Sequence, residues 1–368
     1  MKRTLLVGVI LALVATSVVM AQSDDFGKAA AVYTFPEDHG LHHDDPTMNE
    51  NYIEWLYFTG LVEDEDGRLW GYQFTLFQAL PPKGPAILAF LYDVALTDIE
   101  GERFLHYRGA FPALHQIADT DDGWQFSSRN FAIAYDEIDD IWHLRFAGEM
   151  EDRTNSIEEI PVQIDFELVN DKGDYYVHNE AGLTPIGICD KNRETLDGYT
   201  YYYTHPGLST AGTVAIDGAS IDLVGDTWFD HQWGNFVRCF LAWDWFSLRF
   251  DDGSYMMIFA MLDRNFELSE LFGMTFIDVD GNVTYFTGED EILLMPLRIW
   301  TDPASGIEYP VEWVLETPAG SFGVKPFFDN QVAPPLDIIP DYWEGVISVH
   351  DTNTDGERIG LGYLEVAR

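Results

Sequence analysis

Apolar and polar residues alternate with a period of two along much of the chain. The segments His143–Phe146 and Val162–Leu168 show this alternation, which is typical of antiparallel strands with one buried face. The largely apolar segments Glu54–Gly60 and Leu69–Leu80 are separated by an acidic turn that ends in Asp66-Gly67, and this arrangement predicts a hairpin. No long segment has the period of about 3.6 residues that marks an amphipathic helix. The pattern therefore predicts an all-β protein.

Residues 170–198 interrupt the strand pattern because they are rich in Gly, Asp and Asn. This stretch predicts a boundary between an N-terminal domain, residues 51–198, and a C-terminal domain, residues 199–368. Further strands are predicted at Thr213–Ile216, Ser220–Val224, Tyr255–Leu262, Pro310–Leu315, Tyr342–Val346 and Gly360–Glu365. The pairs Glu54-Trp55 and Asp244-Trp245 each precede an aromatic-rich hairpin, which indicates either a duplicated β-unit or coincidence in an aromatic-rich β protein.

The N-terminus has the features of a secretory signal peptide. A basic start, Met1–Arg3, precedes an apolar run, Leu5–Met20, and the small residue Ala21 stands at the expected cleavage position. We therefore expect residues 1–21 to be removed and the mature protein to be periplasmic or secreted, beginning with a polar segment at residues 22–50. No comparable apolar run follows, so stable membrane insertion after cleavage is not expected. An uncleaved anchor is the alternative.

The chain is strongly acidic. It has 63 Asp and Glu residues against 20 Lys and Arg residues, for a formal net charge of -43. Such a surface repels nucleic acid and anionic lipid head groups, so nucleic-acid binding is not expected. Apolar residues make up 46% of the chain and aromatic residues 15%, which is enough to form packed cores despite this charge.

Two patterns resemble metal sites, but neither has the required spacing. The segment before residue 50 carries His39, His42, His43, Asp44 and Asp45. Their spacing matches no zinc-binding helix motif, which favours a solvated segment over a metal site. Residues 351–356 resemble the start of a calcium loop, but Gly362 stands where the bidentate glutamate is needed, so a hairpin turn is predicted there. We therefore expect no metal site.

The stretch Trp228–Phe236, with the sequence WFDHQWGNF, is the strongest candidate for chemistry. It places one carboxylate, Asp230, and one imidazole, His231, among aromatic residues. An acid held among rings loses hydration, so its pKa rises and it can stay protonated near neutral pH as a proton donor. The alternative is a structural role, in which Asp230 caps a turn or pairs with an arginine such as Arg238.

A series of short motifs follows in a fixed order. The motifs are FPEDHG at residues 35–40, EWLYFTG at 54–60, YYY at 201–203, WFDHQW at 228–233, DWFS at 244–247, YWEG at 342–345 and GYLE at 362–365. From about Phe35 to the C-terminus, this order resembles the AttH family, a lipocalin-like group that includes predicted secreted hydrolases and is related to carotenoid 1,2-hydratase and kievitone hydratase. The resemblance implies two lipocalin-like antiparallel β-barrels or sandwiches packed together.

The resemblance also implies catalytic residues. In the hydratase branch an aromatic-x-Asp pattern is associated with catalysis, and here it falls on Trp228 and Asp230. Tyr201 and Tyr203 fall roughly where that branch has a His and a Trp, and Gln232 stands where many secreted members have Glu. These departures count against a strict carotenoid hydratase. The side chains expected to contact the ligand are Trp55, Tyr57, Gln232, Trp233 and Trp245.

These residue types permit hydration or isomerisation of an alkene without a cofactor. A desolvated Asp230 can protonate carbon, and ring faces such as those of Trp228, Trp233 and Tyr203 can stabilise the resulting cation by about 1 to 2 kcal/mol each. A neutral His231 can then orient or deprotonate the attacking water. The substrate implied by the resemblance is a small apolar molecule of isoprenoid-like or polyketide-like type.

Other functions fit the same residues. In a lipophilic-ligand binding protein, Asp230 and His231 are structural and the aromatic residues are mostly core. A periplasmic accessory to a transporter is a further alternative that no particular residue supports. A serine hydrolase is disfavoured because the chain has no Gly-x-Ser-x-Gly motif, and because Ser209 and Ser247 stand in strand-like segments without an obvious base.

Overall fold

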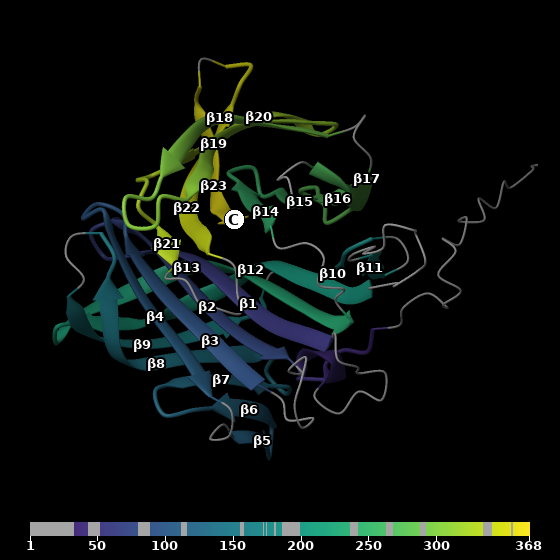
Figure 1. Cartoon of the computed structure of the whole chain (residues 1–368). Coiled ribbons are helices and arrows are strands. Elements are labelled where there is room, and N and C mark those ends of the chain that lie inside the picture. The colour runs from purple at the N-terminus through teal and green to yellow at the C-terminus, as the bar shows by residue number, and fades with distance from the viewer. Residues whose placement is uncertain are drawn as a thin grey trace, which may run out of the picture.

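The computed structural model describes residues 33–42, 52–79, 89–111, 116–154, 158–171, 173, 175–179, 182–185, 199–235, 242–262, 268–287, 292–333, 341–354 and 356–368 (Figure 1). Within these ranges the chain forms β-strands joined by turns, together with a short 3-10 helix, η1 (Glu37–His39). No helix in the described part has the length and apolar character needed to cross a membrane. The all-β prediction is confirmed.

The first sheet contains 13 strands in the described part of the chain. They are β1 (Tyr52–Glu63), β2 (Leu69–Ala79), β3 (Ala89–Asp98), β4 (Arg103–Phe111), β5 (Gln116–Thr120), β6 (Gly123–Ser127), β7 (Phe131–Asp136), β8 (Ile141–Asp152), β9 (Glu159–Val169), β10 (Tyr176–Val177), β11 (Leu183–Pro185), β12 (Tyr199–Ile216) and β13 (Ala219–Asn235). The hydrogen-bonded order runs β12-β13-β1-β2-β3-β4-β8, and β9 pairs with both β8 and β12. Strands β1 to β4, β8, β9, β12 and β13 therefore close into a ring.

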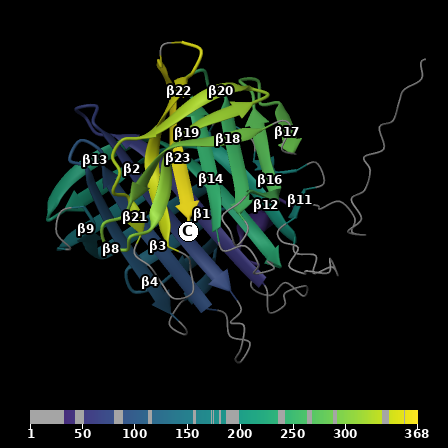
Figure 2. The ribbon, with the colours of Figure 1, turned by 45° about the horizontal axis from the view of Figure 1, so that its top comes forward.

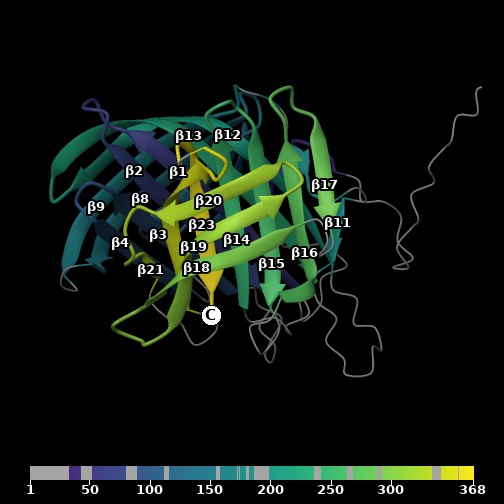
Figure 3. The same ribbon diagram turned by 90° about the horizontal axis from the view of Figure 1, so that it is seen from above.

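The second sheet contains 10 strands in the described part of the chain. They are β14 (Ala242–Phe250), β15 (Tyr255–Leu262), β16 (Leu268–Ile277), β17 (Val283–Thr287), β18 (Leu293–Thr301), β19 (Glu308–Thr317), β20 (Gly320–Pro326), β21 (Val332–Ala333), β22 (Tyr342–Asp351) and β23 (Arg358–Ala367). Their order is β17-β16-β15-β14-β23-β22-β20-β19-β18, with β21 beside β22. Seen from above, this sheet lies across the ring (Figure 3).

Side chains that point into the ring form a hydrophobic core. Because side chains alternate along a strand, β1 contributes Leu56 and Phe58 to this core, and the neighbouring β13 contributes Phe229 and Trp233. The second sheet has a core of its own, to which β14 contributes Phe246. Each sheet therefore buries one face independently of the other.

The outer face of the ring packs against the second sheet, as Figures 1 and 2 show. Tyr57 and Trp228 from the ring form a buried cluster with Trp245 and Tyr363 from the second sheet. The two sheets approach so closely at Gly71 of β2 that a methyl group there would overlap side chains of β22 and β23. This tight contact gives the chain a buried layer between the sheets, in addition to the two cores.

The predicted hairpin of β1 and β2 is confirmed, and residues 352–354 and 356 lie between β22 and β23, where a hairpin turn was predicted. The predicted domain boundary at residue 198 does not coincide with the division between the sheets. Strands β12 and β13 follow that boundary but belong to the first sheet, because they complete the ring between β9 and β1. The sheets divide between Asn235 and Ala242. The predicted signal peptide, residues 1–21, lies outside the described residues.

Candidate active site between the sheets

The alternation of side chains in β13 divides the predicted site into two parts. Asp230 lies opposite Tyr57 of β1, and both point out of the ring toward the second sheet. His231 points into the ring, where its imidazole packs beside Trp233 at 4.8 Å between ring centroids. The sheet therefore separates Asp230 from His231. The prediction that His231 orients a water molecule for Asp230 is wrong, because adjacent residues of a strand face opposite ways.

Asp230 is 2% exposed and is held by two hydrogen-bond donors. The Tyr202 hydroxyl donates to Oδ2 at 2.6 Å, and Trp228 Nε1 donates to Oδ1 at 2.7 Å. Trp245 Nε1, from the second sheet, donates in turn to the Tyr202 hydroxyl at 3.0 Å. Burial raises the pKa of Asp230 to about 6, although the hydrogen bonds from Tyr202 and Trp228 act to lower it. The Asp230 side chain is therefore held in place by hydrogen bonds, and its carboxyl group stays protonated below about pH 6.

Two glutamates of the second sheet, the buried Glu344 and the half-buried Glu365, face the same layer. Glu344 of β22 lies directly opposite Glu365 of β23. The Tyr57 hydroxyl donates to Glu344 Oε1, and Trp243 Nε1 donates to Glu365 Oε1 at 2.5 Å. Among the described residues, Glu344 Oε2 has no hydrogen-bond partner. We call Asp230, Glu344 and Glu365 the carboxyl cluster.

The two glutamates have different affinities for a proton. Burial, followed by the neighbouring charge of Glu365, raises the pKa of Glu344 well above its ordinary value. Burial also raises the pKa of Glu365, to about 7, while the hydrogen bond from Trp243 acts to lower it. Two like charges this close cannot both ionise easily, so Glu344 keeps its proton and Glu365 titrates near neutral pH. The carboxyl cluster therefore contains groups with different pKa values, and it lies among aromatic rings.

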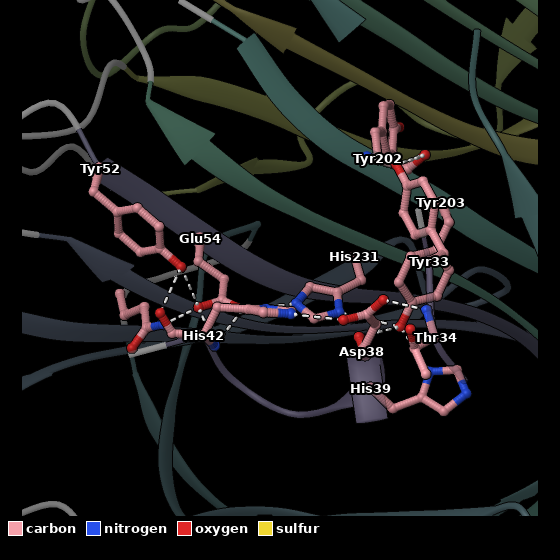
Figure 4. A network of polar contacts seen from close by, with 11 residues as sticks. Tyr33, Thr34, Asp38, His39, His42, Tyr52, Glu54, Tyr202, Tyr203 and His231 are labelled. Carbon is pink, nitrogen blue, oxygen red and sulfur yellow. Dashed lines mark hydrogen bonds and ion pairs between the residues drawn. The ribbon is translucent and has the colours of Figure 1, made fainter. Parts of the chain in front are cut away.

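Inside the ring, His231 belongs to a second polar network (Figure 4). His231 Nε2 lies 2.8 Å from Glu54 Oε1, and His42 Nδ1 lies 2.8 Å from the same oxygen. The Tyr203 hydroxyl lies 3.1 Å from His231 Nδ1 and 2.7 Å from His39 Nδ1. We call His42, Glu54 and His231 the histidine cluster. Its members come from the segment after η1, from β1 and from β13, so only the fold brings them together.

The charges of the histidine cluster are strongly perturbed. Burial acts to lower the pKa of His42, but hydrogen bonds with Asp38 and Glu54 raise it to about 9. Burial acts to raise the pKa of Glu54, but hydrogen bonds from His231 and His42 lower it to about 2. Burial lowers the pKa of His231. At neutral pH the cluster therefore consists of a cationic His42, an anionic Glu54 and a neutral His231.

The fold sorts the predicted site residues by face. Those at the layer between the sheets are Trp55, Tyr57, Trp228, Asp230, Gln232 and Trp245, and those inside the ring are Tyr201, Tyr203, His231 and Trp233. Tyr201 stacks on Trp233 with 5.0 Å between ring centroids. Tyr202, which lies between the two predicted tyrosines, is the residue that binds Asp230. Tyr202 was not among the residues singled out from the sequence, although it stands in the same YYY motif.

Sequence reasoning also missed Glu344, Glu365 and Trp243. The signal was present, since the motifs YWEG and GYLE each place a carboxylate within an apolar strand segment. No position in either motif indicates that the two strands pair with these glutamates opposite each other. Only the register between β22 and β23 brings the two carboxyl groups together.

The surroundings of Ser209, Ser247 and Asp230 bear on two alternatives, a serine hydrolase and an ion pair between Asp230 and an arginine. Ser247 Oγ is buried and has no hydrogen-bond partner among the described residues, and Ser209 Oγ donates to Asp171 Oδ1 at 2.7 Å. Neither serine contacts a histidine base within the described ranges, which disfavours a serine hydrolase. No described arginine forms an ion pair with Asp230, and Arg238 lies outside the described residues.

A cavity of about 620 Å³ lies beside His39. It is lined by the segment before β1, by the turn between β7 and β8, and by residues that follow β9. Phe35, Tyr135 and Tyr175 supply its aromatic surface. His39 in its lining is hydrogen-bonded to Tyr203, which also contacts His231, whereas Asp230 is not part of the lining.

Comparison with known proteins identifies the fold. A sequence model of the AttH-like family matches residues 27–367. No curated protein sequence matches the chain. A crystal structure of a candidate AttH protein from Nitrosomonas europaea is 24% identical and has a TM-score of 0.74, with 93% of this chain and 97% of that chain covered. Kievitone hydratase from Nectria haematococca is 17% identical and has a TM-score of 0.63, with 85% of this chain and 88% of that chain covered. Both likenesses confirm the predicted lipocalin-like fold.

Proposed function

Because this chain belongs to the AttH-like family, we propose that it is a cofactor-free acid–base enzyme that hydrates or isomerises an alkene in a small apolar molecule. The observation that carries the proposal is the environment of Asp230, a buried carboxyl group with a pKa of about 6 among aromatic rings. The fold shared with kievitone hydratase supports the same reaction class. A substrate of isoprenoid-like or polyketide-like type suits a layer whose walls are mostly aromatic.

The proposed reaction begins with a proton transfer. Protonated Asp230 gives its proton to one alkene carbon, and the two π electrons form the new C–H bond. The other carbon becomes a cation, which the face of Trp228 or Trp245 stabilises by about 1 to 2 kcal/mol each. Water then adds to the cation, and its proton passes to the carboxylate of Glu365. For isomerisation, Glu365 instead removes a proton from the carbon next to the cation.

The two carboxyl groups differ in proton affinity, and Glu365 holds its proton more tightly than Asp230. The reactive form, with protonated Asp230 and ionised Glu365, is therefore the less populated of the two forms that share one proton. Asp230 must be protonated, which favours a pH below about 6, and Glu365 must be ionised, which favours a pH above about 7. The product of these two fractions is greatest midway between the two values. We therefore expect a narrow, bell-shaped pH–rate profile with its maximum near pH 6.5, by this estimate of about the mean of the two pKa values.

We propose that substrate enters past Trp55 and Trp243, because both side chains are half-buried and pack against the buried aromatic cluster between the sheets. We also propose that the reaction takes place in the periplasm or outside the cell, on the basis of the signal-peptide pattern at residues 1–21.

The experiment that tests this function is mass spectrometry of organic-solvent extracts of the purified mature protein. Wild type is compared with Asp230→Asn, which keeps the shape of the side chain but has no acidic proton. We expect wild type to carry a hydroxylated or isomerised lipid and the variant to carry its unreacted alkene. If both proteins carry the same lipid, Asp230 is structural and the protein is a carrier.

A second candidate function, binding of a lipophilic ligand without catalysis, is favoured by the cavity beside His39. Its volume of about 620 Å³ lies within the range typical of small-molecule sites, about 300 to 1,000 Å³. The test is a titration with the fluorescent apolar probe N-phenyl-1-naphthylamine. Binding that is lost in Tyr175→Ala but retained in Trp245→Ala supports the carrier function. The opposite result supports a ligand site between the sheets.

A further inference from the structure

Three metal-ligating side chains converge inside the ring, on the opposite face of β13 from Asp230. His42 Nδ1 and His231 Nε2 each lie 2.8 Å from Glu54 Oε1 (Figure 4). One donor atom from each of the three residues lies within 4.8 Å of the other two. His231 and Glu54 are fully buried, and the His42 side chain is 18% exposed. The donors therefore face one small volume that can be reached past His42.

The outward-facing atoms of the same three side chains are each held by another residue. His42 Nε2 lies 3.2 Å from Asp38 Oδ1, and the Tyr203 hydroxyl lies 3.1 Å from His231 Nδ1. Glu54 Oε2 accepts hydrogen bonds from Gln78 Nε2 and, at 3.0 Å, from the Tyr52 hydroxyl. In metal sites a ligating histidine is typically oriented in this way, through a hydrogen bond from its other ring nitrogen to a carboxylate or another acceptor.

The planes of the rings are fixed as well. The His42 ring stacks on Trp233, with 4.0 Å between centroids and 8° between planes. Trp233 also lies 4.8 Å from the His231 ring. Both imidazoles are thus held before any ion binds, which reduces the entropy lost on binding.

We propose that His42, Glu54 and His231 form a binding site for one divalent transition-metal ion, Zn²⁺ or Fe²⁺. Two imidazole nitrogens and one carboxylate oxygen are the donor set that these ions accept, whereas Mg²⁺ and Ca²⁺ prefer oxygen alone. Metal–ligand bonds of about 2.0 to 2.2 Å place neighbouring donors roughly 3 Å apart. The two separations from Glu54 Oε1, each 2.8 Å, need to open slightly, and the two imidazole nitrogens, which lie within 4.8 Å of each other, need to come to the same spacing.

The proposal does not depend on the alkene chemistry proposed above. The ion lies inside the ring, and the carboxyl cluster lies outside it, so the two sites share β13 but no side chain. Binding releases the proton between His42 Nδ1 and Glu54, and the proton of neutral His231 moves from Nε2 to Nδ1, where the Tyr203 hydroxyl can accept its hydrogen bond. Three protein ligands leave at least one coordination position for water, as in catalytic and not in purely structural zinc sites.

The test is calorimetric titration of tag-free, chelator-treated protein with Zn²⁺, together with the absorption spectrum of the Co²⁺ complex. We expect wild type to bind one ion per chain and to give the visible bands of Co²⁺ with nitrogen and oxygen ligands. Glu54→Gln and His231→Gln should each weaken Zn²⁺ affinity by more than about 100-fold. This loss exceeds the roughly 10- to 100-fold loss that is typical when a residue hydrogen-bonded to a metal ligand is replaced. The matched control is His106→Gln, since His106 is also buried beside a carboxylate, with Nε2 3.4 Å from Asp93 Oδ1.

A variant of Asp38, which is hydrogen-bonded to His42, gives a second measurement of the site. Asp38→Asn, which changes only the residue behind His42, should weaken binding by roughly 10-fold and leave one ion per chain. This variant replaces the ligand variants if their circular dichroism shows that they do not fold. Absence of Zn²⁺ binding by wild type overturns the proposal. So does equal affinity in wild type, His231→Gln and Asp38→Asn, which would place the ion elsewhere on the acidic chain.

Discussion

Replacing Asp230 by asparagine removes one titrating group from the layer between the sheets and should flatten the dependence of stability on pH. The pKa of Asp230 is raised from 3.8 to about 6 in the folded protein, which is about two pKa units. A group with a raised folded pKa contributes stability that is fully present below the unfolded value and is lost as pH rises through the folded value. At about 1.4 kcal/mol per unit, Asp230 alone costs wild type about 3 kcal/mol in total as pH rises, of which about 2 kcal/mol is lost between pH 4 and pH 6.

The assay is urea-induced unfolding of wild type and Asp230→Asn at several pH values from 4 to 8. The many other carboxylates titrate in both proteins, so the difference between the two free energies of unfolding isolates Asp230. We expect the variant to gain about 2 kcal/mol relative to wild type between pH 4 and pH 6, and roughly another half kcal/mol between pH 6 and pH 8. A difference that stays constant across the whole range would refute the argument that burial perturbs this group.

Three further predictions concern the same layer. Tyr202→Phe removes a hydrogen bond that stabilises ionised Asp230 by about 1.5 to 3 kcal/mol, so the pKa of Asp230 should rise by roughly one unit or more. In the same urea series, the free energy of unfolding should then keep falling up to a correspondingly higher pH. Glu365→Gln removes a carboxyl group whose pKa is raised to about 7, so thermal unfolding midpoints should fall less between pH 5 and pH 8 than in wild type, and an unchanged slope would contradict the assignment. Gly71→Ala should destabilise the fold by about 1 to 3 kcal/mol because the added methyl group overlaps side chains of the second sheet. In the control Gly323→Ala, the nearest atom to the added methyl group lies at 3.7 Å, so the free energy of unfolding should change by less than about 1 kcal/mol. Equal effects of the two substitutions would contradict the close packing of the sheets.

The sequence was sufficient for the fold class because the relevant signal is local. Period-two alternation in Val162–Leu168 and the Asp-Gly turn before Leu69 each report strand structure within a few residues. The closure of the ring is different, since β9 must pair with both β8 and β12. No local pattern specifies that pairing, and the predicted boundary at residue 198 consequently separated β12 from the sheet to which it belongs.

The candidate site could be predicted only in part for the same reason. Asp230 was identified from its aromatic neighbours, and its raised pKa agrees with that reasoning. His231 was assigned to the same site because it is adjacent in sequence, although adjacency in a strand places side chains on opposite faces. Glu344 and Glu365 are far from Asp230 in sequence and face the same layer only because the second sheet packs on the ring, where the charge of Asp230 acts on Glu365.

The histidine cluster also could not be predicted from local sequence patterns, because its members come from separate segments of the chain. His42 was noted with its histidine and aspartate neighbours in sequence, and a metal there was disfavoured because their spacing fits no motif. Its partners in the fold are Glu54 and His231, which lie on two different strands. His43, Asp44 and Asp45 lie outside the described residues.

The most direct test of the central claim, that Asp230 donates a proton to carbon, is isotope incorporation. Wild type and Asp230→Asn are incubated with an organic-solvent extract of the producing cells in D₂O enriched in ¹⁸O, and the products are followed by high-resolution mass spectrometry. With wild type we predict products that gain one non-exchangeable deuterium on carbon, and one ¹⁸O where water has been added. With Asp230→Asn these products should be absent. The same products from both proteins, or none from wild type, would contradict the claim.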